Sequence, residues 1–124
     1  GIASNALIDE INILQATYEA MRESISKLSK TPDILLVDAV HIPGINIKQV
    51  GIVKGDAKSV NIAAASILAK VTRDRLMLEY DKIYPEYGFA SNKGYGTAKH
   101  IEALKAYGAC DIHRRTFIGN FVGE

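Results

Sequence analysis

Apolar residues recur at three- and four-residue steps from Ile8 to Leu28. This spacing places them on one face of an α-helix, and the side chain of Ser4 or Asn5 can accept a backbone N–H at its start. Pro32 cannot continue a helix. The pattern therefore predicts a first helix that ends shortly before this proline.

Two short apolar runs follow, and an acidic residue comes after each. The compact run 34–37 is typical of a buried strand and leads into Asp38. After a Pro-Gly turn, residues 49–54 predict a second strand that stops at Gly55, and Asp56 comes next. The pattern thus predicts a carboxylate just beyond each of two strands.

Residues 59–83 contain no proline or glycine, which favours one long helix. Residues 86–96 contain three glycines and indicate a long loop. Thr97 can cap a short further helix that stops at Gly108, and the tail after it shows no clear periodicity. We assign the tail no secondary structure.

This order of elements predicts an α/β or α+β fold with helices packed on a small sheet. The chain has 124 residues, 48% of them hydrophobic and 23% charged, which excludes a disordered protein. No repeat or linker interrupts it, so we expect residues 1–124 to form a single domain. The first residue is Gly1 rather than methionine, so we expect the numbering to begin inside a longer gene product, or after processing or cloning.

The longest mainly apolar run, residues 62–69, is far shorter than the roughly 20 residues that a membrane span needs. The single cysteine, Cys110, cannot form a disulfide within the chain and suits a reducing compartment. We therefore expect a soluble cytoplasmic protein that does not bind membranes.

Asp38 and Asp56 are the candidate metal ligands. Reactive groups in open sheets gather beyond the strand ends, so these carboxylates face one cleft if their strands are neighbours. Hard cations such as Mg²⁺ or Mn²⁺ prefer oxygen ligands. Aspartates at strand ends also serve as turn formers and caps, so spacing alone leaves both interpretations open.

Several longer sequence motifs are more specific than the spacing of the two aspartates. They are Ile-Asp-Glu-Ile-Asn-Ile-Leu-Gln-Ala-Thr at 8–17, Val-Asp-Ala at 37–39, Val-Lys-Gly-Asp-Ala-Lys-Ser at 53–59, Ile-Ala-Ala-Ala-Ser-Ile-Leu-Ala-Lys-Val-Thr-Arg-Asp-Arg-Leu-Met at 62–77, Tyr-Pro-Glu-Tyr-Gly-Phe at 84–89, Lys-Gly-Tyr-Gly-Thr at 93–97 and Ile-His-Arg-Arg-Thr-Phe at 112–117. In this order they resemble bacterial ribonuclease HII, and the resemblance covers nearly the whole chain.

The resemblance implies a ribonuclease H-like mixed sheet flanked by helices. The family carries four acidic residues around a two-metal site, and two of these positions match Asp38 and Asp56. The family's N-terminal Asp-Glu and Gly-Arg-Gly words are absent from this chain. We therefore expect the C-terminal portion of the fold, truncated of its N-terminal strands and of half of its metal ligands.

The implied activity is that of a metal-dependent endonuclease, a hydrolase that uses Mg²⁺ or Mn²⁺. It cuts the RNA strand of an RNA–DNA hybrid and nicks a DNA duplex 5′ of a single ribonucleotide. With only two carboxylates a cation is held weakly, so we expect this segment alone to be nearly inactive. A truncated sheet edge also favours self-association.

The resemblance implies that Tyr95 lies in the minor groove beside the ribonucleotide, where a tyrosine ring can sense the 2′-hydroxyl. Lys93 and Lys54 are candidates for phosphate contacts, and Ser59 for a backbone N–H cluster that holds a phosphate. Asp74 is an alternative to Asp56 near the metal, although an ion-paired helix residue is the simpler interpretation. For His113 we favour a structural role.

Two other classes of function stay open. In a non-catalytic nucleic-acid-binding module the basic residues between Lys48 and Arg75 bind the backbone, and the aspartates only cap strands. In a phosphate-binding fold the word at 53–59 acts as a P-loop, but it lacks that motif's glycine spacing. Dependence on Mg²⁺ separates the first from a nuclease, and ATP binding tests the second.

Overall fold

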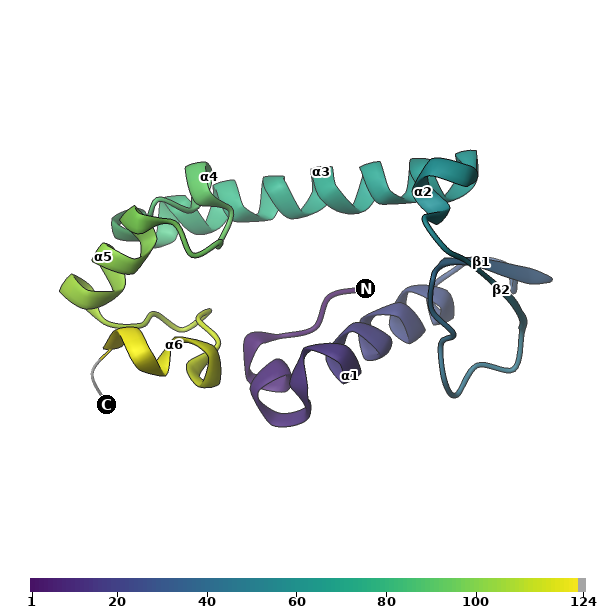
Figure 1. Cartoon of the computed structure of the whole chain (residues 1–124), viewed down its shortest axis with the longest axis horizontal. Helices are drawn as coiled ribbons and strands as arrows, with labels where there is room; N and C mark the ends of the chain where they lie inside the picture. Colours follow the sequence, from purple (N-terminus) through teal and green to yellow (C-terminus); the bar gives the residue numbers. More distant parts are fainter. Residues whose placement is uncertain (123–124) are drawn as a thin grey trace. The chain divides into compact units, whose positions relative to one another are not determined.

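The computed structural model describes the backbone of residues 1–122 and the side chains of residues 1–118. The chain divides into two compact units, Gly1–Leu68 and Ala69–Glu124. Figure 1 shows the order of the elements along the chain. The single domain expected over residues 1–124 stays a prediction.

The first unit begins with α1 (Asn5–Ser26), and the side-chain oxygen of Ser4 accepts the N–H of Leu7. This confirms the predicted helix and its cap. The helix is kinked at Asn12, whose backbone has φ 72° and ψ 168°. The Asn12 side chain accepts the N–H of Gln15 at 3.0 Å, so it acts as the N-cap of the helical segment that follows. The apolar spacing continues across the kink and gave no sign of it.

Strands β1 (Ile34–Asp38) and β2 (Lys48–Ile52) form a parallel pair, in which Ile34 lies opposite Lys48 and Asp38 lies opposite Ile52. Both predicted strands are therefore confirmed, the second with bounds one to two residues earlier. The side chain of Gln49 bonds both the N–H and the carbonyl of Ile42, which fixes the connection between the strands.

The apolar run 34–37 predicted a strand that is buried on both faces. Strand β1 is buried on one face only. Leu35 and Val37 are partly or fully buried, whereas Ile34 and Leu36 are 44% and 39% exposed. Successive side chains of a strand point to opposite faces, so the exposed residues share one face. Within the described residues that face is left largely uncovered.

Helix α2 (Gly55–Lys58) follows β2, and α3 (Val60–Ile83) continues from it. The bounds of α3 agree with the predicted long helix, and its residues after Leu68 belong to the second unit. None of the described helices is both long and apolar enough to span a membrane.

The second unit differs from the sequence prediction in two places. The segment expected to be a loop contains the 3₁₀-helix η1 (Pro85–Tyr87) and α4 (Phe89–Asn92). The tail, which we assigned no secondary structure, forms α6 (Arg115–Val122). Between them, α5 (Ala98–Tyr107) begins after Thr97 and ends at Gly108, as predicted.

The core of the second unit explains both corrections. Phe89 is only 2% exposed, and its ring stacks on that of Tyr87 at 5.4 Å between centroids. Ile118 of α6 is buried in the same cluster, which also contains Met77, Ala103, Leu104 and Cys110. Burial of these apolar side chains stabilises short helices that have little stability of their own.

Candidate functional site

Asp38 is the last residue of β1 and lies on its exposed face, together with Ile34 and Leu36. Its Oδ1 accepts the backbone N–H of Gly55 at 2.9 Å. This bond joins the end of β1 to the start of α2, which are 17 residues apart in sequence. It fixes one carboxylate oxygen of Asp38.

Gly55 is buried and fits this position because it has no side chain. A Cβ there would lie 2.7 Å from Cδ1 of Ile62, which would have to move, and 3.3 Å from Cα of Asp38, which is a tight contact. Lys54 before it has a left-handed backbone with φ 54°, which turns the chain from β2 into α2. This turn sets Asp56 one residue beyond the N–H group that bonds Asp38.

Asp56 lies in the first turn of α2 and is exposed. Its Oδ1 accepts the N–H of Ala57 at 3.0 Å. None of the ion pairs found within the described residues involves Asp38 or Asp56, so no cationic side chain neutralises them. Carboxylates without a cationic partner suit a hard divalent cation, which prefers oxygen ligands and keeps several waters.

The described residues contain no group of three or more His, Cys, Asp or Glu side chains that could hold a metal. The candidate centre in the first unit is therefore a pair of carboxylates. Two carboxylates can hold a cation only if waters or other ligands complete its coordination.

Lys54 and Ser59 flank this turn within the first unit. Lys54 is exposed and precedes the buried Gly55. The N–H of Ser59 donates to the carbonyl of Gly55 at 2.8 Å, and its hydroxyl accepts the N–H of Ile62 at 3.3 Å. Ser59 thus caps the start of α3, and the phosphate contacts predicted for both residues stay predictions.

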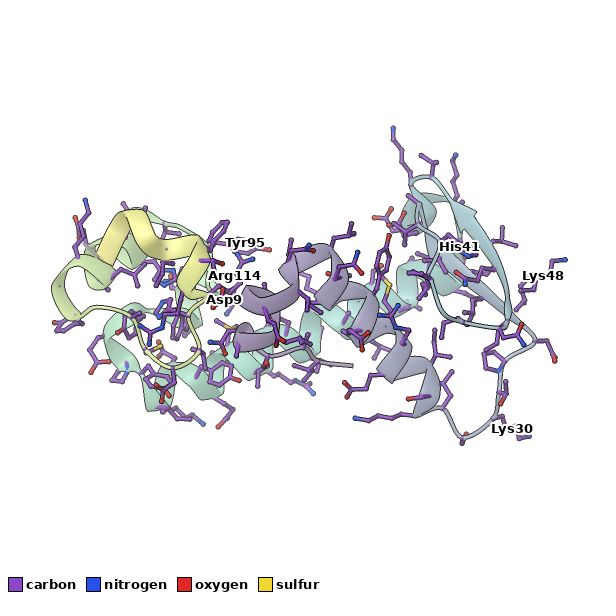
Figure 2. All side chains as sticks on the ribbon, turned by 90° about the horizontal axis from the view of Figure 1, so that it is seen from below. Asp9, Lys30, His41, Lys48, Tyr95 and Arg114 are labelled. Atoms are coloured by element: carbon purple, nitrogen blue, oxygen red, sulfur yellow. The ribbon has the colours of Figure 1, made fainter. Side chains whose placement is uncertain are left out.

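The second unit holds Tyr95 in a turn between α4 and α5. The Tyr95 side chain is 71% exposed and can be followed in Figure 2. Its backbone is well anchored, because its N–H donates to the carbonyl of Asn92 and its carbonyl accepts the N–H of Thr97, both at 2.9 Å. The same carbonyl lies 2.7 Å from Nδ1 of His100.

Lys93 opens this turn with a left-handed backbone of φ 55°. Its carbonyl accepts a hydrogen bond from Nη2 of Arg73 at 3.2 Å. Its ammonium group bonds the carbonyl of Ala90. The structure therefore places Lys93 two residues from Tyr95, with its charge engaged by the backbone of α4.

His113 is buried, which confirms the structural role that we favoured for it. Its Nδ1 accepts the N–H of Cys110 at 3.0 Å, and its Nε2 lies 2.8 Å from Nε2 of His100. Burial, with smaller contributions from the nearby His100 and Arg115, lowers the pKa of His113 to about 4. The ring is therefore neutral near pH 7.

Asp74 is partly buried on α3, in the part of the helix that belongs to the second unit. The ion pairs found within the described residues do not include it, so the expected pairing with a neighbouring arginine is not seen. Its contribution to a metal site stays a prediction.

Sequence reasoning missed His100 and Asn92, both of which are buried and polar. The amide of Asn92 donates to the carbonyl of Tyr87 at 2.6 Å and accepts the N–H of Gly94 at 2.8 Å. The sequence offered one sign for His100, because it stands three residues after Thr97, the residue that we predicted to cap the helix. Nothing in the sequence pairs it with His113.

The candidate residues thus fall into two groups. The first group lies around the start of α2 and consists of Asp38, Asp56, Lys54 and Ser59. The second group lies in the turn before α5 and consists of Tyr95 and Lys93.

Comparison with known proteins gives one consistent result. The family model described as Ribonuclease HII matches residues 2–120. The chain is 68% identical over 120 residues to the Ribonuclease HII of Lachnoclostridium phytofermentans, which covers 97% of this chain and 47% of that protein. Identity to the Ribonuclease HII of Clostridioides difficile is 62% over 122 residues, or 98% and 48% of the two chains. For the Ribonuclease HII of Geobacter metallireducens it is 54% over 119 residues, or 96% and 56%. The chain therefore spans about half the length of the curated relatives it matches.

Proposed function

This chain belongs to the ribonuclease HII family, and we propose that it is the C-terminal part of a metal-dependent endonuclease. Its substrates are an RNA–DNA hybrid and a DNA duplex that contains single ribonucleotides. The reaction hydrolyses the phosphodiester bond 5′ of a ribonucleotide and leaves a 3′-hydroxyl and a 5′-phosphate. The observation that supports the proposal is the hydrogen bond from Gly55 to Asp38, because Gly55 is the residue before Asp56.

Asp38 and Asp56 hold the divalent cation. A bound Mg²⁺ or Mn²⁺ would supply the positive charge that favours ionisation of the attacking water and stabilises the leaving oxygen. The chain's own contribution is to orient the ligands: the Gly55 N–H fixes Oδ1 of Asp38, and the Ala57 N–H holds Oδ1 of Asp56. Asp74 is kept as an alternative acidic ligand.

The parallel pair β1 and β2 belongs to a ribonuclease H-like mixed sheet within one catalytic domain. The other strands come from the part of the relatives that this chain does not match. Parallel sheets are normally covered on both faces, so the exposed Ile34 and Leu36 support this proposal.

Tyr95 senses the 2′-hydroxyl of the ribonucleotide. The exposure of its side chain leaves the ring free to stack on a sugar. Lys93, Lys54 and Ser59 contact the phosphate backbone, and Lys93 exchanges its bond to the carbonyl of Ala90 for one to phosphate.

The segment alone is nearly inactive. A pair of carboxylates carries too little charge to hold and orient the cations that phosphodiester hydrolysis needs, and poor positioning costs orders of magnitude in rate. Without the remaining strands, the exposed face of β1 also favours self-association.

The test compares this chain with an extended chain, in which the unmatched N-terminal half of the Lachnoclostridium phytofermentans relative precedes it. Each is assayed on a duplex with a single ribonucleotide, with Mg²⁺ or Mn²⁺. Cleavage by the extended chain alone, lost in Asp38→Asn and in Asp56→Asn, supports the proposal.

Asp33→Asn is the matched control, because Asp33 is an exposed carboxylate just before the other end of β1. It should leave cleavage unchanged. An extended chain that folds and cuts no ribonucleotide-containing duplex overturns the proposed activity, and efficient cleavage by this chain alone overturns the two-carboxylate account.

A further inference from the structure

His100 and His113 form a hydrogen-bonded chain whose direction can be assigned. The carbonyl of Tyr95 can only accept, so Nδ1 of His100 carries a proton. The N–H of Cys110 can only donate, so Nδ1 of His113 carries none. The remaining contact joins the two Nε2 atoms at 2.8 Å.

A single pair of neutral tautomers satisfies all these contacts. His113 carries its proton on Nε2 and donates it to Nε2 of His100, which in turn donates from Nδ1 to Tyr95. Every ring nitrogen is then used, so the chain runs without a gap from the N–H of Cys110 to the carbonyl of Tyr95. Protonation of His100 breaks this order because the two Nε2 atoms would both be donors, and protonation of His113 breaks it because its Nδ1–H would face the N–H of Cys110.

The surroundings keep both rings in place. His100 and His113 are 5% and 6% exposed. The ring of Tyr87 meets His113 edge-on at 4.8 Å, and that of Phe89 meets His100 at 5.5 Å. The neighbouring Arg115 also lowers the pKa of His113, and the sulfur of Cys110 lies 3.2 Å from its Nδ1. Burial raises the pKa of that thiol, so it also stays neutral.

The turn that carries Tyr95 makes hydrogen bonds of its own, and the histidine pair adds one more at the carbonyl of Tyr95. Tyr95 lies between Gly94 and Gly96, and Gly94 has a left-handed backbone with φ +88°. Glycine has the largest conformational freedom of any residue, so this segment loses much entropy when it is ordered. The exposed ring of Tyr95 adds little packing. The buried histidine pair therefore adds a contact from the core to the hydrogen bonds that the turn makes itself.

We propose that His100 and His113 are positioning residues, which hold the backbone of Tyr95 so that its ring is preorganised for the ribonucleotide. The proposal rests on the proposed role of Tyr95 in substrate recognition. It adds a specific means: the pair acts on the carbonyl of Tyr95 and touches neither the substrate nor the metal. Ordering the turn before binding avoids an entropic cost during recognition.

The tautomers can be observed in this chain itself by ¹⁵N-edited NMR of the imidazole rings. The proposal expects the Nδ1–H form for His100 and the Nε2–H form for His113 at pH 7. His41, which is exposed and labelled in Figure 2, is the internal reference for an unconstrained ring. A different tautomer at either buried ring, or averaging like that of His41, overturns the proposal.

A double-mutant cycle in the extended chain tests the link to Tyr95. His100→Ala should lower kcat/KM on the single-ribonucleotide duplex about tenfold, the effect of one well-placed hydrogen bond. In a Tyr95→Ala background the same substitution should have no further effect. His100→Asn keeps a donor near the position of Nδ1 and should restore much of the activity, while His41→Ala should change nothing.

The outcomes separate the two proposals. If Tyr95→Ala lowers activity but His100→Ala lowers it equally in both backgrounds, the positioning role is wrong and the role of Tyr95 stands. If Tyr95→Ala has no effect, the role of Tyr95 in recognition is wrong, and the positioning role falls with it even where the tautomers are as expected.

Discussion

Gly55 is the residue where the turn before α2 comes closest to Asp38. Its N–H bonds the carboxylate, and its missing side chain leaves room for Ile62. The backbone of Gly55 is not left-handed, so its conformation does not require a glycine. The hydrogen bond that fixes Asp38 depends on a glycine here for steric reasons.

Gly55→Ala should destabilise the chain by about 2 kcal/mol, because the added methyl group overpacks the contact with Ile62 and Asp38. Gly96→Ala is the matched control, since a Cβ there meets nothing within 4 Å. Urea denaturation of the two variants measures the difference. Equal stabilities would contradict the close approach at Gly55.

The buried His113 predicts a pH dependence of stability. Its pKa of about 4 in the folded chain is below the ordinary 6.5, so between these values the unfolded state binds more protons. The neutral His113 therefore contributes about 3 kcal/mol to the free energy of unfolding above pH 6.5. This contribution is lost as the pH falls towards 4.

Denaturation at pH 7 and pH 5 tests this, because most carboxylates stay ionised over that range. His113→Gln keeps a donor towards His100 but does not titrate. The native chain should lose more stability than this variant on going to pH 5. Equal losses would show that His113 does not stay neutral.

Helix ends in this chain are controlled by single side chains. Ser4, Asn12 and Thr97 each accept a backbone N–H three residues ahead. Ser4 and Thr97 precede apolar helical patterns and were recognised from the sequence. Asn12 stands inside such a pattern, and its positive φ has no local signature.

Thr97→Ala should destabilise the second unit by about 1 kcal/mol, because the first turn of α5 loses its capping oxygen. Thr97→Ser keeps a hydroxyl and should be close to the native chain. Circular dichroism during thermal unfolding compares the two. A loss of the same size for serine would mean that the methyl group, and not the cap, matters.

At the scale of the whole molecule, the uncovered face of β1 is the feature that bears on assembly. Ile34 and Leu36 lie on it with Asp38 at its end. Apolar strand surface that stays open to water favours pairing with another chain.

We expect this chain to self-associate as its concentration rises, and Leu36→Lys to reduce that association by placing a charge on the face. Lys30, which is exposed between α1 and β1 and labelled in Figure 2, provides a control through Lys30→Ala. Size-exclusion chromatography over a range of concentrations is the measurement. A chain that is monomeric at every concentration would contradict the expectation.

The sequence by itself determined the elements that depend on local order. The helix over Val60–Ile83, the caps at Ser4 and Thr97, and the acids after two strands follow from apolar spacing and residue chemistry. Its longer words also indicated the family that the comparisons show. These features involve neighbours a few residues apart, so a linear pattern contains them.

Only the tertiary structure decided the contacts between distant segments. Asp38 meets Gly55 across 17 residues, and His100 meets His113 across 13. The tail forms a helix in which Ile118 is buried in the core of the second unit. The sequence of the tail alone did not predict this packing. Burial and hydrogen-bond direction arise only when separate elements pack, and for that reason the histidine pair behind Tyr95 was not predicted.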